Sequence, residues 1–355
     1  MDIKELLFLT IKNSASDLHL LVGLPPTFRI DGVLRPLGTA PALRPEDLEQ
    51  MVYSLLTPEQ KELLIANKEL DFSFGIGQNI AQEDGRFRIN AYFQKGYLSA
   101  ALRFLAPNVR TIEELNLPKV CHEFAKLKQG FVLVTGPSGH GKSSTLAAIL
   151  NEINLSRHAH ILTIEDPIEY VYPKSNSIIS QREMGTDTHS WNLALRSALR
   201  EDPDVVLIGE MRDPDTMQAA ITLAETGHVV FSTLHTNSAA QSIDRIVDAF
   251  PADQRPQVRI QLAATLKGVI SQRLLPRIGG GRIPAVEILL GTPAVASNIR
   301  DGKSHLIDSV IQTSKDTGMV TIDDSLSDLV RNGLVTLDDA KAYSFREAEL
   351  LRLVK

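Results

Sequence analysis

Cysteine is almost absent from this chain of 355 residues, which contains a single one, Cys121. One cysteine cannot form an intrachain disulfide, and it cannot supply the thiolates of a multi-cysteine zinc site. These two means of holding a fold together are therefore excluded. We expect Cys121 to be a small buried side chain of the core.

Long apolar runs are also missing. No run approaches the roughly 20 residues that a membrane-spanning helix needs, and residues 1–17 lack a basic stretch followed by a cleavable apolar one. We therefore expect a cytoplasmic protein.

A surplus of positive charge is absent too, because the formal net charge is −6 and the isoelectric point is about 5.9. Affinity for phosphate backbones depends on clustered Lys and Arg, so we expect no nucleic-acid partner.

Residues 1–107 predict an α+β domain of mixed order. Apolar positions recur at helical spacing in residues 1–13, where Asp2 is placed to cap the helix. Short β-like runs, two helical patterns over residues 44–67 and three further strand patterns complete the domain. A linker over residues 108–128 follows.

Strand and helix patterns alternate from residue 129 onward. The predicted strands are nearly all apolar, which is typical of a parallel sheet covered on both faces. The sequence therefore predicts a doubly wound nucleoside-triphosphatase core in a domain over residues 129–355. Its alternating elements are strands at 131–135, 160–164, 205–209 and 228–233 and helices at 142–153, 190–200, 213–225 and 238–248.

The remainder of this domain is mostly helical in pattern. Helices are predicted over residues 254–275 and from 304 to the end, with a strand at 284–291 between them. A run of three glycines has basic side chains on both sides. We expect this segment to form a mobile loop. The alternative is that the basic side chains are simply solvated charges. These side chains are Arg273, Arg277 and Arg282.

The most specific motif is a glycine-rich loop between the first strand and the first helix of the core. A phosphate chain needs many hydrogen-bond donors and no crowding by side chains, which a glycine-rich turn at a helix N-terminus supplies. The pattern G-x-x-x-x-G-K-S is that of a P-loop, in which Lys142 reaches the β- and γ-phosphate oxygens and the Ser143 hydroxyl suits Mg²⁺. The predicted nucleotide-binding residues are Gly136, Pro137, Ser138, Gly139, His140, Gly141, Lys142, Ser143 and Ser144.

Carboxylates follow two of the predicted strands, at the sheet edge where ligands lie in open α/β folds. Glu210 comes just after one apolar strand, and Glu165 and Asp166 end another. Such acids can hold a metal ion and orient water, which makes Glu210 the candidate Walker B acid. Either Glu165 or Glu169 is placed to act as the catalytic base, and the residues alone leave this choice open. The predicted metal ligands are Ser143, Glu165, Asp166 and Glu210.

Two histidines flank the fourth predicted strand of the core. His228 begins it, and His235 follows its end beside Thr233, Thr236 and Asn237. A polar cluster at this place can sense the γ-phosphate through hydrogen bonds. We therefore predict a functional role for His235 and leave His228 open between a functional and a structural role.

Four boxes in this order, GPSGHGKS, ILTIEDPIEY, VVLIGEMRD and STLHTNSA, resemble the Walker A, Asp, Walker B and His boxes of the secretion ATPase superfamily. The segments SDLHLLVGLPPTFRIDGVLRPL, GRFRINAYFQ and NSAAQSIDRIVDAFP narrow the resemblance to the PilT-type retraction ATPases of type IV pili. The likeness runs over essentially the whole chain. One departure is AVASNIRD at residues 294–301, where that family usually carries AIRNLIRE.

The resemblance implies a PAS-like N-terminal domain followed by a RecA-like P-loop ATPase domain with a helical C-terminal region. It implies ATP and Mg²⁺ as cofactors, Glu169 as the catalytic glutamate, Glu210 as the Walker B acid and His235 as the sensor. It also implies a homohexameric ring with nucleotide at subunit boundaries, where arginines of the N-terminal domain face the γ-phosphate. The matching arginines are Arg86, Arg88 and Arg103, of which we favour Arg88 and Arg103.

The implied function is a motor that hydrolyses ATP to retract type IV pili and power twitching motility. It would act in the cytoplasm, peripherally at the inner-membrane base of the pilus. The implied partners are further copies of the chain, a platform protein of the inner membrane and a paralogous ATPase. The alternatives are an accessory retraction ATPase of the PilU type, a non-hydrolysing nucleotide-binding scaffold, and a pilus-assembly or DNA-secretion ring ATPase.

Overall fold

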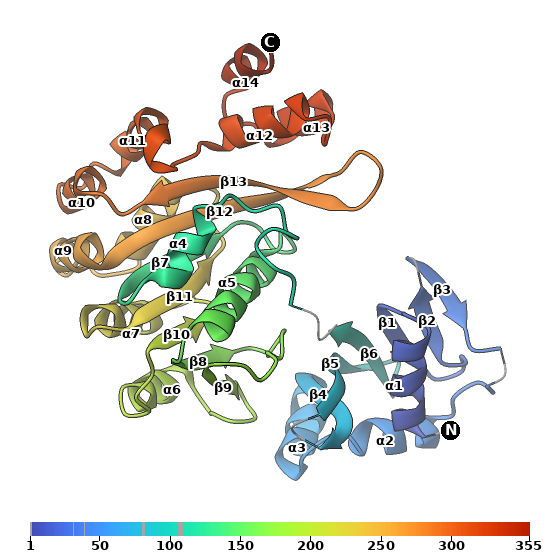
Figure 1. The fold of residues 1–355 in the computed structure, drawn as a ribbon. Coiled ribbons are helices and arrows are strands. Elements are labelled where there is room, and N and C mark those ends of the chain that lie inside the picture. The colour runs from blue at the N-terminus through green and yellow to red at the C-terminus, as the bar shows by residue number, and fades with distance from the viewer. Residues whose placement is uncertain (1, 31, 39, 80–81, 106–108) are drawn as a thin grey trace. The chain divides into compact units, whose positions relative to one another are not determined.

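The computed structural model describes residues 2–30, 32–38, 40–79, 82–105 and 109–355 (Figure 1). The predicted domain boundary at Pro107 lies outside the described residues. Contacts divide the chain into two units, the first comprising Met1–Asn108 with Pro167–Val171 and the second comprising Val109–Asp166 with Tyr172–Lys355.

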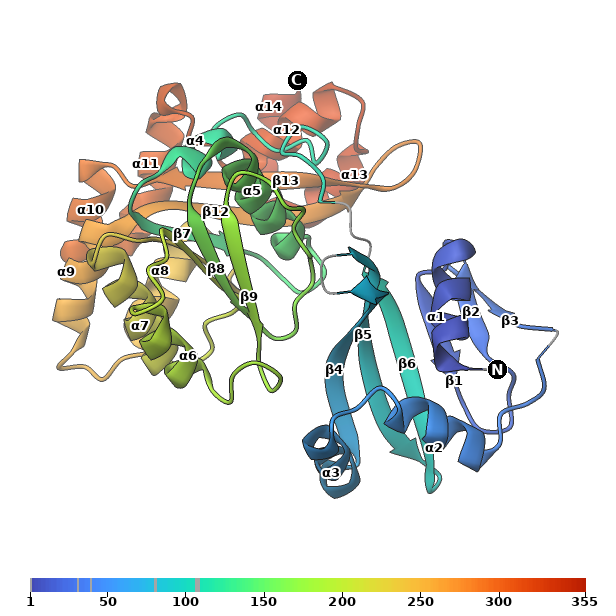
Figure 2. The same ribbon diagram turned by 60° about the horizontal axis from the view of Figure 1, so that its bottom comes forward.

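The first unit is built on a six-stranded antiparallel sheet with the order β3-β2-β1-β6-β5-β4. The helices of this unit and one face of the sheet together form a hydrophobic core. Figure 2 shows the long strands β4, β5 and β6 side by side. The elements are α1 (Ile3–Lys12), β1 (Asp17–Leu20), β2 (Thr27–Ile30), β3 (Val33–Pro36), α2 (Pro45–Tyr53), α3 (Pro58–Asn67), β4 (Glu69–Asn79), β5 (Gln82–Gln94) and β6 (Tyr97–Leu105).

Local sequence explains how α3 begins. The Thr57 hydroxyl accepts from the backbone N–H of Gln60, while the Gln60 side chain accepts from the N–H of Thr57, a reciprocal capping box before α3. Asp2 occupies the predicted N-cap position of α1, but its side chain makes no capping hydrogen bond. The mixed order of helices and strands predicted for this unit is confirmed.

The second unit contains a seven-stranded sheet with the order β13-β12-β7-β11-β10-β8-β9. Six strands are parallel, and β13 pairs antiparallel with β12. The strands are β7 (Gly130–Thr135), β8 (His160–Glu165), β9 (Ile178–Glu183), β10 (Val205–Ile208), β11 (Val229–Leu234), β12 (Leu266–Pro276) and β13 (Arg282–Leu290).

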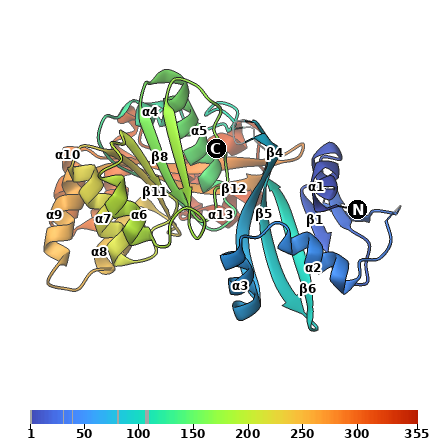
Figure 3. The ribbon, with the colours of Figure 1, turned by 90° about the horizontal axis from the view of Figure 1, so that it is seen from below.

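Helices cover both faces of this sheet, as the apolar strands predict. Successive residues of β7 point to opposite sides, so Phe131 and Leu133 join one core cluster and Val132 and Val134 join the other. Figure 3 shows α4 and α5 on one side of the sheet and α6 to α9 on the other. These helices are α4 (Cys121–Lys126), α5 (Lys142–Ser156), α6 (Trp191–Ala198), α7 (Pro214–Glu225), α8 (Ala239–Asp248) and α9 (Arg255–Thr265).

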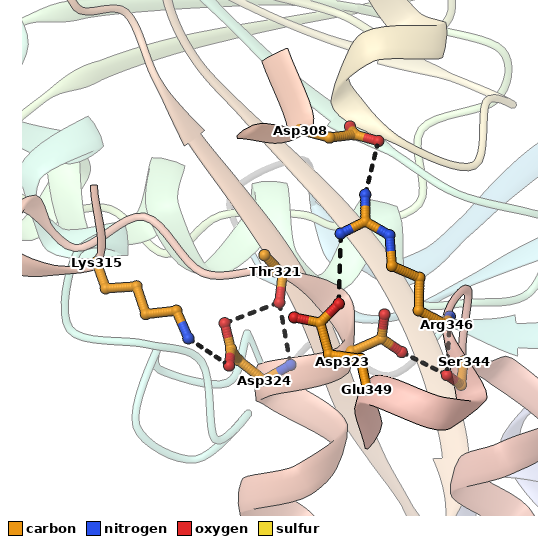
Figure 4. A network of polar contacts seen from close by, with 8 residues as sticks. All are labelled: Asp308, Lys315, Thr321, Asp323, Asp324, Ser344, Arg346 and Glu349. Atoms are coloured by element: carbon orange, nitrogen blue, oxygen red, sulfur yellow. Dashed lines mark hydrogen bonds and ion pairs between the residues drawn. The ribbon is translucent and has the colours of Figure 1, made fainter. Parts of the chain in front are cut away.

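A helical region follows the β12–β13 hairpin. Its residues 322–354 pack on the hairpin through a separate small core that includes Leu275, Ile283 and Leu326, whereas residues 293–313 join one of the two main cores of the sheet. Polar contacts tie this region together (Figure 4): Arg346 contacts Asp308 and Glu349, and the Ser344 hydroxyl donates to Asp323. The elements are α10 (Pro293–Arg300), α11 (Ile307–Thr313), α12 (Ile322–Arg331), α13 (Leu337–Tyr343) and α14 (Glu347–Val354), with 3₁₀ turns at Ser304–Leu306 and Lys315–Thr317.

Two predictions for the second unit were wrong. The predicted helix over 254–275 ends at Thr265, and the chain continues as β12, the second strand from one edge of the sheet. The basic cluster is not a single loop, because Arg273 is buried inside β12 and Arg282 begins β13. Only the turn between the two strands, where the Arg277 N–H donates to the Gly281 carbonyl, matches the expected loop.

Candidate active site

The P-loop lies between β7 and α5, as predicted. Gly136, Gly139 and Gly141 have φ values of 143°, 76° and 82°, a region that L side chains rarely adopt. At Gly136 a Cβ atom would lie 2.4 Å from the carbonyl oxygen of Gln272, so this position also lacks space for a side chain. The loop therefore depends on glycine for both its backbone conformation and its close approach to β12.

Lys142 is the first residue of α5, and its side chain folds back over the loop. Its ammonium group donates to the carbonyl oxygens of Gly136 at 2.9 Å and Pro137 at 3.0 Å. It also lies 3.4 Å from Nδ1 of His235. The P-loop lysine and the predicted sensor histidine are thus neighbours.

Glu210 follows β10 and links this pair to a further cation. Its Oε1 is 3.2 Å from Nε2 of His235, and its Oε2 is 3.0 Å from the guanidinium of Arg212. In the tautomer with hydrogen on Nε2, His235 donates to Glu210 and accepts from Lys142. Burial raises the pKa of Glu210, but the hydrogen bond and charge of Arg212, together with His235, outweigh it and hold this pKa below its ordinary value. Glu210 is therefore a carboxylate at neutral pH.

The acids after β8 have different surroundings. Glu165 is buried and accepts hydrogen bonds from the Thr163 hydroxyl at 2.6 Å and the Gln181 amide at 3.3 Å. Asp166 is exposed and close enough to Arg212 to raise the pKa of that guanidinium further, after the larger effect of Glu210. Because β8 and β10 are adjacent parallel strands, both sets of acids lie at the same edge of the sheet.

The donor set suits Mg²⁺ held jointly with a nucleotide. Ser143, Glu165, Asp166 and Glu210 offer the oxygen ligands that Mg²⁺ prefers, and Mg²⁺ commonly binds one or two protein groups together with phosphates and water. No cluster of three or more His, Cys, Asp or Glu residues able to hold a metal occurs in the part of the chain that the structure describes. These residues fit a shared Mg²⁺–nucleotide site rather than a metal site made by protein alone.

Three predicted catalytic residues belong to the first unit and are not part of this cluster: Glu169, Arg88 and Arg103. The two arginines face each other across β5 and β6 on the side of the sheet away from the core. Arg103 pairs with Asp17 at 2.9 Å, and its side chain remains 70% exposed. Burial raises the pKa of Asp17, but the Ser16 hydroxyl and Arg103 outweigh it and lower this pKa. Like charges directly opposite in a sheet are unfavourable, and the Asp17 carboxylate compensates the charge of Arg103.

His228 has a structural environment. Its Nδ1 lies 2.9 Å from the carbonyl oxygen of Leu223 and 3.1 Å from the Thr226 hydroxyl, both at the end of α7. These contacts favour the structural alternative for His228.

Sequence reasoning missed two groups of residues near the site. Arg212 follows Glu210 by two positions, and its charge in the segment GEMRD was the available signal. Gln272 and Arg273 lie in the strand predicted as helix, and both contact loops of the site. No motif in the sequence pointed to the role of Gln272.

The fold and the site together define a P-loop nucleoside triphosphatase with a RecA-like core. Residues 2–281 match the family described as type II/IV secretion system protein, and the chain belongs to this family. The predicted fold class and family resemblance are thus confirmed.

Two relatives and one solved structure show how close the likeness is. The chain is 46% identical over 341 residues to the type IV pilus retraction ATPase PilT of Pseudomonas aeruginosa, covering 96% of this chain and 97% of that one. It is 37% identical over 356 residues to the type IV pilus ATPase PilU of the same organism, covering 100% and 92%. The crystal structure of the pilus retraction motor PilT with bound ADP matches with a TM-score of 0.91 at 46% identity, covering 99% of each chain.

Proposed function

We propose that this chain is an ATP-hydrolysing motor of the PilT type, which retracts type IV pili and so powers twitching motility. The observation that carries the proposal is the contact series from Lys142 through His235 to the ionised Glu210. It joins the phosphate-binding loop to the acid expected to serve hydrolysis. The likeness to PilT over almost the full length of both chains supports the pilus role.

The second unit supplies the groups for phosphate chemistry. Lys142 leaves the carbonyl groups of Gly136 and Pro137 and binds the β- and γ-phosphate oxygens. His235 exchanges its contact with Lys142 for the γ-phosphate and passes the presence of that group to Glu210 and the segment before α8. Mg²⁺ would be held by Ser143 with Glu210, Glu165 and Asp166 nearby, and it would neutralise developing phosphate charge.

Glu169 is the proposed catalytic base, as the family resemblance implies. It would accept a proton from the attacking water, and an ionised carboxylate suits this task. Glu165 is the weaker candidate, because the Thr163 hydroxyl and the Gln181 amide already donate to one of its oxygens.

The chain is proposed to act as a homohexamer in which neighbours complete each other's sites. Arg88 and Arg103 lie on the open face of the first unit, where their permanent charge suits the γ-phosphate of an adjacent subunit. In this proposal residues 1–107 form the N-terminal domain, 108–128 the linker and 129–355 the ATPase domain. Release of the γ-phosphate would free the arginines and permit the movement that drives the pilus.

The proposed location is the cytoplasmic face of the inner membrane at the pilus base, with a platform protein and a paralogous ATPase as partners. Among the residues that the structure describes, no helix combines the length and hydropathy of a membrane span. The motor role is favoured over the PilU-like accessory role because identity to PilT, at 46%, exceeds identity to PilU, at 37%.

Gene deletion tests the biological role. Cells without the protein should be hyperpiliated and immobile on a surface if it retracts pili. Bald cells would instead identify an assembly ATPase, and unchanged piliation with normal twitching would contradict a pilus role. Stimulation of turnover by DNA would favour the DNA-secretion alternative.

Phosphate release by purified protein tests the enzyme. Lys142→Ala should abolish turnover, whereas Lys303→Ala, at an exposed lysine near the start of α11, should keep it. Full turnover in Lys142→Ala would contradict the site. Arg88→Ala and Lys142→Ala subunits should each be inactive alone, and mixing them should restore activity if sites are shared.

A further inference from the structure

Strand β12 contains an unusual run of buried polar residues. Ser271, Gln272 and Arg273 are 1%, 2% and 6% exposed, although β12 lies between β7 and β13 inside the sheet. Burying polar groups costs free energy unless each finds a hydrogen-bond partner. The hydrogen-bond partners of these three side chains therefore indicate why polar residues occupy this part of β12.

The amide of Gln272 bridges two parts of the nucleotide site. Its Nε2 donates to the carbonyl oxygen of His140 at 2.7 Å, and its Oε1 accepts from the Thr145 hydroxyl at 2.7 Å. His140 lies in the P-loop and Thr145 in the first turn of α5. An amide can do this because it carries a donor and an acceptor on one rigid group.

The P-loop rests directly on this part of β12. A Cβ atom at Gly141 would lie 2.8 Å from the Gln272 amide nitrogen, which shows how little space separates the two segments. The backbone N–H of Leu274 donates to Nδ1 of His140 at 3.0 Å, and Arg282 of β13 donates to the carbonyl oxygen of Gly139 at 3.1 Å. The loop is thus held from the β12–β13 hairpin as well as from β7 and α5.

Arg273 holds a different segment of the site. Its guanidinium donates to the side-chain oxygen of Asn237 at 2.8 Å and to the carbonyl oxygen of the same residue at 3.2 Å. Asn237 follows His235 by two positions. On β13, the carboxylate of Glu287 accepts from the N–H of Ala239, the first residue of α8, at 2.7 Å. The hairpin therefore fixes the segment that follows His235 at two points.

We propose that Gln272 and Arg273 are positioning residues for ATP hydrolysis, with Gln272 holding the P-loop and Arg273 holding the loop that carries His235. Neither acts on the nucleotide directly. Gln272 thereby sets nucleotide affinity, because the loop it shapes binds phosphates in substrate and product alike. Arg273 sets turnover, because the loop it holds acts on the γ-phosphate, which only ATP carries. The proposal rests on the ATPase activity of the chain.

Steady-state ATP hydrolysis and calorimetric ADP binding, both measured on the full-length protein, test this proposal for Gln272 and Arg273. Gln272→Leu should raise the ADP Kd and the KM for ATP about tenfold with kcat within about threefold of wild type. Arg273→Met should lower kcat about tenfold or more with the ADP Kd within about twofold of wild type. Two milder variants should have smaller effects. Thr145→Val should raise the ADP Kd and the KM for ATP, and Arg273→Lys should lower kcat.

Ser325→Ala is the matched control. The Ser325 hydroxyl accepts from the N–H of Val286, which lies opposite Gln272 on the same hairpin, so this variant perturbs the hairpin without removing the Gln272 or Arg273 side chain. This variant should lower the melting temperature and leave KM, kcat and the ADP Kd unchanged. The proposal is overturned if the Gln272 and Arg273 variants behave like Ser325→Ala, or if both shift the same kinetic parameter. A wild-type protein that neither binds nor hydrolyses ATP would instead contradict the proposed function.

Discussion

Glu287 offers a direct test of the electrostatics beneath the site. Its carboxyl group is buried on β13 and accepts from the backbone N–H of Ala239. Burial raises its pKa to about 7, and the nearby Asp308 and Asp323 add to this shift, while the Ala239 N–H and Arg273 oppose it. The informative change is Glu287→Gln, which keeps the shape and the oxygen acceptor and removes the ionisation.

The magnitude follows from the difference between the folded and unfolded pKa values of Glu287. The shift from 4.5 to about 7 is about 2.5 pKa units, and at about 1.36 kcal/mol per unit it corresponds to about 3 kcal/mol. Between these two pH values the folded protein binds more protons than the unfolded chain, so stability falls as pH rises. The stabilisation is complete below about pH 4.5 and is lost as pH rises through about 7.

Urea unfolding of the full-length protein at pH 5, 6, 7 and 8 measures this effect. The wild type should lose about 2.5 kcal/mol relative to Glu287→Gln across this range, because the first part of the total loss falls below pH 5. Asp253→Asn, at an exposed acid between α8 and α9, should run parallel to wild type. A constant difference between wild type and Glu287→Gln from pH 5 to pH 8 would refute the raised pKa.

Three further changes test the site and the core. Gly136→Ala should abolish ADP binding measured by calorimetry, because its φ of 143° is strained for alanine and the added Cβ would lie 2.4 Å from the Gln272 carbonyl oxygen; normal ADP affinity would contradict this. Glu210→Gln should lower kcat for phosphate release by roughly two orders of magnitude while ADP still binds, and turnover near wild type would exclude a catalytic role. Cys121, whose pKa burial raises to about 12, should react with thiol reagents only after unfolding, so rapid labelling of the native protein would show that it is accessible.

The sequence predicted the site best for polar residues at the carboxyl ends of the parallel strands. The carboxyl ends of parallel strands share one sheet edge, so residues just after apolar strands were expected to meet. Lys142, Glu210 and His235 do meet there, within 3.4 Å from one side chain to the next. Glu169 could not be placed in this way, because it follows β8 by four residues and belongs to the first unit.

The strand β9 and the behaviour of Asp2 were not predicted from the sequence, because the local signal for each is weak. β9 lies at the sheet edge and most of its side chains are only partly buried, so it lacks the continuous apolar run of its neighbours. Asp2 has the residue type of a helix cap, but capping depends on a side-chain geometry that composition does not determine. In both cases the tertiary setting decides the outcome.

The failure at β12 has a different cause. Its first half contains Leu266, Val269 and Ile270, but the polar residues 271–273 follow at the point where an inner strand should be most apolar. A residue that violates the rules of its own element persists when it serves a neighbouring structure, which is why such violations concentrate at functional sites. Here the polar side chains contact the end of β7, the P-loop with the start of α5, and the loop after His235. The polar residues that concealed the strand in the sequence are therefore the same ones that connect it to the candidate active site.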